Sequence, residues 1–466
     1  MSTMKSGHEL AVLSTNKSGR SVSPNGSTAA LNGGNAKKKE TKSWKEYYYG
    51  PRDMNHHSKW PFVFRLHGSV TPELIMPLLL VAAWTTAIWA IDHYSGENST
   101  STQRRKPRAL HFDSILLTVL GFVVGLSLSL RSSTAYERWT EGRKYWAQLQ
   151  LTSQNFARLI WVHCVEREGD DAKDDLLTKI TCLNLIVAYS LAMKHRLRFE
   201  PYVNYPDMEP YVEYLDTFAK EANKGVDLTQ PKDSVWMKVG DFLGMPWAEK
   251  NPRRQIKLAQ KPLGNLPLEI LNHISGYIDG AIINGQLKTP IFQVQALTSI
   301  TTMNDILTGC DRVLNTPLPV AYSIAISQIT WVYILALPFQ LIQKLQWKVI
   351  PATLVAAYIM LSLITIGREI ENPFGDDVND LPLEAYCDQI ATDIDIISSS
   401  PAPKASEFAK RAQNLPLYPL SGNGYQAWAA SDESEIRDAL RAKVGMRHYN
   451  QKHDQAYSSG RDMNEV

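Results

Sequence analysis

Cysteine is scarce in this sequence, and the short motifs of common enzyme classes are missing. Its 4 cysteines, Cys164, Cys182, Cys310 and Cys387, lie far apart in 466 residues. They form no C-x-x-C pair, which argues against a disulfide framework or a zinc site of the usual spacing, so we expect four reduced thiols. The sequence also contains no glycine-rich phosphate loop, nucleophile elbow or H-E-x-x-H motif. We therefore predict that the protein is not an enzyme.

Charge is absent from four long stretches, although 21% of all residues are charged. These stretches cover residues 74–91, 114–130, 314–343 and 349–367. The third is longer than one helix needs, and Pro317, Pro319 and Pro338 are expected to mark where its helix starts and bends. At about 1.5 Å per residue, helices of such lengths span most or all of a hydrocarbon core of about 30 Å. The sequence thus predicts a multi-pass protein surrounded by membrane lipid, in the plasma membrane or an internal membrane. A further apolar run, residues 182–193, is too short to cross and is predicted to be a buried core helix.

The polar remainder divides into three regions. Residues 1–43 are mostly Ser, Gly, Asn and Lys, which predicts a disordered polar tail over residues 1–54, with an organelle transit peptide as the alternative. Residues 131–313 carry Leu, Ile and Val at helical spacing and are predicted to form a mainly helical domain. Residues 401–466 are predicted to be a polar, partly disordered tail. Basic residues flank the second span on both sides, so charge does not set the orientation, and we place the termini and the helical domain in the cytosol.

The second span carries two adjacent stripes. Phe122, Leu126 and Leu130 form an apolar stripe at positions i, i+4 and i+8. Small or polar residues form the other, at Ser114, Thr118, Gly121, Gly125 and Ser129. Gly121 and Gly125 form a G-x-x-x-G step, which allows another helix to pack closely. Helical spacing alone does not decide whether either stripe faces a pore, another helix or lipid.

Three motifs each adjoin a span. They are 125-GLSLSLRSSTAYERWTEGRKYWAQL-149, 310-CDRVLNTPLPVAY-322 and 368-REIENPFGDDVNDLPLE-384. Together they resemble the bestrophin and bestrophin-like channels, in the form found in fungal, plant and bacterial members, over residues 55–400. The resemblance implies an all-α membrane protein with four transmembrane helices per subunit and a mainly helical cytosolic domain, assembled as a homopentamer.

The same resemblance implies a passive anion channel that conducts chloride, bicarbonate or nitrate. The second span would line the central pore, with Phe122, Leu126 and Leu130 as its narrow neck. No nucleic-acid partner and no obligatory cofactor are predicted. The motif residues expected to shape the family fold are Arg131, Tyr136, Arg138, Trp139, Glu141, Arg143, Asn315, Pro317, Pro319, Glu371, Asn372, Pro373, Phe374 and Gly375.

The charges of the first motif have a simpler interpretation beside the family one. Arg138 with Glu141, and Glu141 with Lys144, are i, i+3 pairs that would stabilise a solvated helix continuing from the second span. Tyr136, Trp139 and Trp146 give an aromatic, amphipathic register that suits the membrane boundary.

The acidic residues of the third motif also leave two interpretations open. The resemblance implies a calcium site made by Asp377, Asp380 and the backbone of Asn372, although Val378 and Asn379 interrupt the acidic run. Alternatively, the motif is structural: Pro373 stops a helix, Phe374 anchors the turn, and Asp376 and Asp377 cap the next helix or pair with a basic residue such as Arg368.

A second class of function remains, a membrane-anchored interaction protein whose helical domain recruits partners. An anchor needs no stripe of Ser, Thr and Gly in a spanning helix, which favours the channel. A secondary transporter is disfavoured because no inverted repeat is visible and no charge lies within a span.

Overall fold

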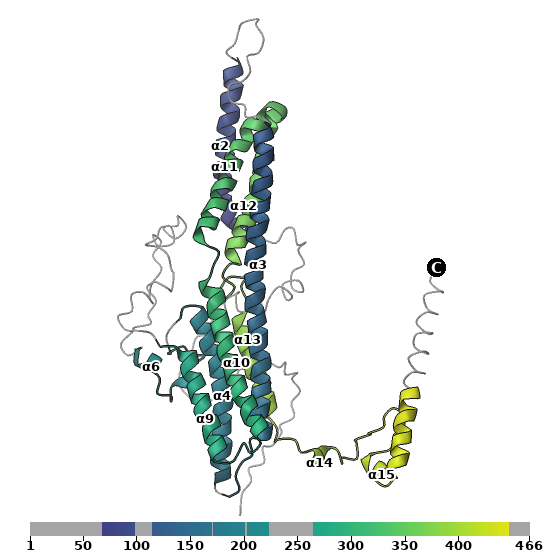
Figure 1. Ribbon diagram of the computed structural model, residues 1–466. Coiled ribbons are helices and arrows are strands. Elements are labelled where there is room, and N and C mark those ends of the chain that lie inside the picture. The colour runs from purple at the N-terminus through teal and green to yellow at the C-terminus, as the bar shows by residue number, and fades with distance from the viewer. Residues whose placement is uncertain (1–67, 98–113, 170, 201–202, 223–263, 447–466) are drawn as a thin grey trace, which may run out of the picture. The chain divides into compact units, whose positions relative to one another are not determined.

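The computed structural model describes residues 68–97, 114–169, 171–200, 203–222 and 264–446. Within those ranges every regular element is a helix (Figure 1). The predicted tail of residues 1–54 and most of the loop between the first two spans lie outside the described residues. The assignment of regions to the cytosol stays a prediction.

The uncharged stretches fold into α2 (Thr71–Glu97), the first part of α3 (Ser114–Arg158), α11 (Val320–Leu345) and α12 (Val349–Glu369). The third uncharged stretch begins within the end of α10 (Pro290–Asn315), and the spanning helix α11 begins only at Val320, directly after the two prolines predicted to mark its start. Pro317 and Pro319 lie in the break, where proline cannot donate the backbone hydrogen bonds of a continuing helix. Pro338, where a bend was expected, lies inside α11.

These four helices contact one another but are covered only in part. α2 packs on α11 and α12, and α3 packs on the same two helices. Val124 and Leu128 of α3 meet Ile326 of α11 in one small buried cluster, which explains why these residues are apolar. Most apolar side chains of α2 point away from the protein, as Ile75 does at 56% exposed.

The main core lies elsewhere, around α4 (Asp171–Leu197). α4 contacts α9 (Leu266–Ile283), α10, α13 (Leu383–Ser398) and the short α5 (Glu209–Val212), and α6 (Phe218–Ala222) packs on α9. Ile186, Tyr189 and Met193 of α4 are completely buried. The prediction that residues 182–193 form a buried core helix is confirmed.

Helix α3 connects the two groups of helices. Figure 1 shows it beside α11 and α12 along one part and beside α10 and α13 along another, in agreement with its contacts. Beyond the uncharged stretch it continues without a break and buries Trp146, Leu149 and Phe156 in the main core, before a short π-helix, η3 (Leu159–His163). The expectation that Trp146 lies at the membrane boundary is therefore wrong, because the residue is 1% exposed in that core. Residues 401–446 include α14 (Ala405–Phe408), α15 (Tyr425–Ala429) and a further helix at 433–446.

Candidate functional site

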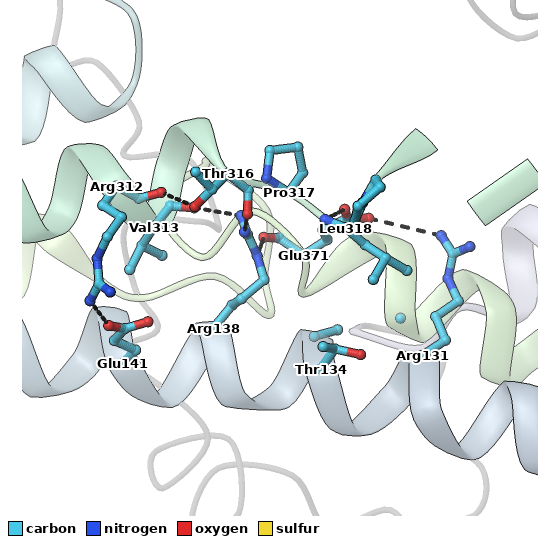
Figure 2. Close-up of a pocket in the computed structure, with 13 residues that line it drawn as sticks. Arg131, Thr134, Arg138, Glu141, Arg312, Val313, Thr316, Pro317, Leu318 and Glu371 are labelled. Atoms are coloured by element: carbon cyan, nitrogen blue, oxygen red, sulfur yellow. Dashed lines mark hydrogen bonds and ion pairs between the residues drawn. The ribbon is translucent and has the colours of Figure 1, made fainter. Parts of the chain in front are cut away.

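The three motifs meet around one cavity, at the point where α3 leaves the uncharged stretch. The cavity measures about 290 Å³ and is lined from α3, from the α10–α11 break and from the end of α12. Figure 2 shows side chains from all three segments turned toward one another. Motifs that lie up to about 230 residues apart in the chain, as Arg138 and Glu371 do at a separation of 233, thus form one structural unit.

Arg138 holds that unit together. Its guanidinium donates to the backbone oxygen of Glu371 from Nε at 3.0 Å, and to the backbone oxygens of Thr316 and Val313 from its two Nη atoms. Carbonyl oxygens at the end of α10 have no partner within the helix, so the arginine satisfies groups that would otherwise be unpaired. Burial lowers the pKa of Arg138, and the Glu371 and Glu141 carboxylates act in the opposite direction.

Arg131 and Glu371 lie at the other end of the cavity. Arg131 is 7% exposed, and its Nη2 is 3.9 Å from Oε2 of Glu371. Oε1 of Glu371 accepts the backbone N–H of Leu318 at 3.2 Å. A Cβ at Gly367 would lie 3.2 Å from Cγ of Arg131, so the glycine gives the arginine its space.

The i, i+3 pairs expected on α3 are not the main contacts of these charges. Glu141 forms an ion pair with Arg312 of α10, and Arg312 also donates to the Tyr145 hydroxyl at 3.0 Å. Arg138 points to backbone carbonyls instead of Glu141, because the α10–α11 break presents acceptors that a solvated helix would lack. The interpretation of these charges as a purely solvated helix face is therefore wrong for Arg138.

The aromatic residues of the first motif reach different partners. Trp139 donates from Nε1 to the backbone oxygen of Asn379 at 3.1 Å, which ties α3 to the acidic loop. Tyr136 is 62% exposed and stacks on Trp139. The guanidinium of Arg143 lies 4.5 Å above the ring of Tyr386 on α13, a cation–π contact.

The N-P-F-G segment packs against α3. Phe374 is fully buried, and a Cβ at Gly142 would lie 3.0 Å from its ring and 3.2 Å from Pro373. A Cβ at Gly375 would lie 2.4 Å from Oδ2 of Asp380. Asn372 accepts the backbone N–H of Phe374 at 3.5 Å, so the segment forms a tight turn after α12. Asn315 is exposed at the last position of α10.

The residues that the resemblance assigns to calcium, Asp377 and Asp380, hydrogen-bond within their own loop, and the calcium site stays a prediction. Oδ2 of Asp380 accepts the backbone N–H of Asp377 at 2.8 Å, and burial raises the pKa of Asp380 to about 7. Calcium takes about 6–8 oxygen ligands, and the described part of the chain brings no three His, Cys, Asp or Glu side chains together for a metal.

The structural alternative for the acidic loop needs a correction of its own. Asp376 pairs with Arg198 at 3.5 Å, whereas Arg368 pairs with Glu73 of α2 at 3.0 Å. Neither Asp376 nor Asp377 caps the next helix, because the residue before α13 is Pro382. The loop joins α4 to the end of α12 by an ion pair that sequence spacing could not indicate.

The candidate pore stripe lies on the uncovered face of α3. Phe122, Leu126 and Leu130 are 74%, 55% and 63% exposed, whereas Val124 and Leu128 on the opposite face are 1% and 3% exposed. The small-residue stripe is divided: Thr118, Gly125 and Ser129 are also exposed, but a Cβ at Gly121 would lie 3.0 Å from the Tyr333 hydroxyl of α11. Gly121 therefore serves helix packing.

Comparison with known proteins assigns this arrangement. The model of the bacterial and fungal bestrophin proteins matches residues 52–395. The chain belongs to the bestrophin family. The resemblance drawn from the three motifs is thereby confirmed, as is the multi-pass, all-helical membrane fold.

Relatives of this bestrophin are found in bacteria. A voltage-dependent anion channel-forming protein of Synechocystis is 30% identical over 340 residues, which cover 73% of this chain and 91% of the relative. A protein of the same description from Escherichia coli O157:H7 is 24% identical over 333 residues, covering 71% and 89%. The crystal structure of a bacterial bestrophin homolog from Klebsiella pneumoniae matches with a TM-score of 0.50 at 20% identity, covering 70% of this chain and all of that one. That likeness supports the fold.

Two residues where the three motifs meet, Arg312 and Gly142, were not among the site residues predicted from the sequence. Arg312 lies inside the second motif, and only the structure shows that it pairs with Glu141 across two helices. Gly142 had a sequence signal, since a glycine inside a long helical pattern often marks a close approach of another segment.

Proposed function

We propose that this chain is one subunit of a passive anion channel and that the exposed stripe of α3 lines the conducting path. The observation that carries the proposal is the asymmetry of α3. One face packs on α11 and α12, while Phe122, Leu126 and Leu130 remain uncovered by the chain itself. The relatives described as anion channel-forming support the assignment of function.

The chemistry of the stripe suits anions. No Asp or Glu occurs in residues 114–130, so no fixed negative charge on this segment repels an anion. A ring of apolar side chains acts as a gate by dewetting, because an ion cannot replace its hydration shell there unless the ring widens or stays wet. Chloride, bicarbonate and nitrate are the anions we propose, each small and monovalent.

A path of this kind needs several copies of the chain, and we propose a homopentamer. A single α3 cannot enclose a pore, and its exposed apolar residues require either lipid or a further subunit. The family membership favours a channel over an enzyme. It also favours a channel over a simple membrane anchor, which has no use for an uncovered helix stripe that leads to the charged residues around Arg131 and Arg138.

The test is current measurement with purified protein in a planar bilayer under asymmetric potassium chloride. The account expects a reversal potential near the chloride equilibrium potential, which shifts when chloride is replaced by the larger gluconate on one side. A reversal potential near the potassium equilibrium potential, or no current from protein of verified fold, would reject it. Native mass measurement in detergent tests the pentamer separately, and a stable monomer or dimer as the sole species would count against it.

A further inference from the structure

Arg131 has a guanidinium group that the chain itself leaves incompletely paired. The side chain is 7% exposed, and Nε is buried without a hydrogen-bond partner. The carboxylate oxygen of Glu371 lies 3.9 Å from Nη2, beyond hydrogen-bonding distance. A buried cation loses its hydration, so it is stable only when acceptors replace the lost water. Arg131 therefore requires a further acceptor.

The charges that line the cavity do not balance. Its wall contains the guanidinium groups of Arg131, Arg138 and Arg312 and the carboxylates of Glu141 and Glu371. Arg138 donates to backbone carbonyl oxygens, which carry no net charge. The wall thus has an excess of one positive charge. Figure 2 shows Arg131 at one end of this wall, where the marked contact of its guanidinium is the long ion pair with Glu371.

The cavity is large enough for a small polyatomic anion. Its volume of about 290 Å³ exceeds the roughly 30 Å³ that one water molecule occupies in the liquid. Thr316 and Pro317 of the lining are exposed, so the cavity can be reached from outside the subunit. Val313 and Leu318 supply apolar surface, which lowers the local dielectric and strengthens a hydrogen bond between ions.

We propose that this cavity binds a monovalent oxyanion, with Arg131 as its principal ligand. A planar group such as nitrate or a small carboxylate presents two oxygens to the two Nη atoms of a guanidinium, a bidentate geometry that arginine supports. The phosphodiester of an anionic lipid offers the same charge and oxygens, and Arg131 directly follows the uncharged stretch of α3. The ligand chemistry is the same for both sources.

The bound anion adds a further contact among the three segments at this end of the cavity. It pairs with Arg131 on α3, beside Glu371 after α12 and Leu318 before α11. Binding here requires no conduction, so the proposal goes beyond the channel function and can fail independently of it. Because an anion that binds only the folded state stabilises it by mass action, the site is detectable as a change in melting temperature.

The experiment measures the melting temperature of delipidated protein in detergent as nitrate replaces chloride at constant ionic strength. Wild type should show a saturable rise. Arg131→Lys keeps the charge but loses the planar guanidinium with its paired Nη donors, so its half-saturating concentration should increase about tenfold or more, the factor for one lost charge-assisted hydrogen bond. Arg441→Gln, which removes an exposed arginine, is the matched control and should respond like wild type.

Two further arms complete the test. Glu371→Gln removes the competing carboxylate, so it should lower the half-saturating concentration and does not depend on the folding of an Arg131 variant. Phosphatidylglycerol, compared with phosphatidylcholine, tests the lipid source: a response to this lipid that Arg131→Lys weakens assigns the phosphodiester as the ligand. If wild type responds to neither nitrate nor phosphatidylglycerol, or if Arg131→Lys responds as wild type does, the proposal is overturned.

Discussion

The first part of α3 and the whole of α4 have similar hydropathy but opposite surroundings. The apolar window of the helical stretch Leu117–His163 has a mean hydropathy of 1.4 and is 22% buried, whereas that of α4 has a mean hydropathy of 1.6 and is 67% buried. The chain covers α4 with its own helices, whereas it leaves one face of the first part of α3 open to lipid or to further subunits.

The position of charge separates the two helices where average hydropathy does not. α4 begins with charged residues, and two of them are buried and paired: Asp175 with Arg167 at 2.7 Å, and Lys179 with Glu166 at 2.5 Å. The first part of α3 contains no charged residue. An apolar helix that starts in ion pairs therefore belongs to a core surrounded by water, whereas an uncharged run long enough to span a bilayer does not.

Truncating one isoleucine in the self-covered core and one on an uncovered spanning helix should give the largest difference in stability. Ile186→Ala in α4 removes a completely buried side chain, which costs about 2–5 kcal/mol in a packed core. Ile75→Ala in α2 removes a side chain that is 56% exposed, and it should change stability by about 0.5 kcal/mol or less. Thermal melts in detergent measure both. An equal loss for Ile75→Ala would show that this face of α2 is packed against another subunit.

Replacing a glycine of α3 by alanine should show the difference between the packed and the uncovered part of this one helix. Gly142→Ala forces a Cβ within 3.0 Å of the Phe374 ring, and such overpacking costs about 1–3 kcal/mol. Gly125→Ala meets nothing within 4 Å and should cause no loss of stability. The same melts compare the two variants. A harmless Gly142→Ala would mean that the N-P-F-G turn can shift away from α3.

A change in pH should act on the end of α4 and spare the uncharged segments. Burial opposes the charged form of His195, but hydrogen bonds to Asp207 and Glu200, at 3.0 and 2.6 Å, outweigh it and raise the pKa of the imidazole. Lys194, on the same helix, lies against Asp207 at 2.5 Å. A raised histidine pKa stabilises the fold fully below the unfolded value of about 6.5 and is lost as pH rises through the folded value.

The predicted result is a melting temperature that falls as pH rises above neutrality, by a smaller amount than in the preceding variants. His195→Gln should remove this pH dependence, because glutamine does not titrate. If the melting temperatures of the wild type and of His195→Gln change equally with pH, the hydrogen bonds of His195 contribute nothing to the pH dependence of stability.

Calcium removal is expected to have the smallest effect of all. Asp377 and Asp380 supply two carboxylates, because Val378 and Asn379 interrupt the acidic run, whereas calcium takes about 6–8 oxygen ligands. Currents should therefore persist when a chelator is added on both sides of the bilayer. Complete and reversible loss of current, restored by calcium, would show that these residues do form a working site.

Sequence reasoning recovered the parts of this fold that depend on local pattern. Uncharged runs located the spans, and the short run at 182–193 was correctly separated from them by length. The contacts of Arg138 and Glu141 could not be predicted from the sequence. Their partners are the backbone of residues 313–316 and the side chain of Arg312, which lie beside α3 only because the chain breaks between α10 and α11 at Pro317. The stripe of α3 could be drawn on a helix, but its exposure depends on which face α11 covers.

The central claim is that the uncovered face of α3 lines an anion path, and cysteine modification during recording tests it most directly. The native cysteines are all buried, so an introduced thiol at the surface is the accessible one. We predict that a negatively charged methanethiosulfonate reagent reduces the current of Leu126→Cys irreversibly, and leaves wild type and Val124→Cys unchanged. An unmodified current from Leu126→Cys, in protein that conducts and is assembled, would contradict the account and place this face of α3 against lipid.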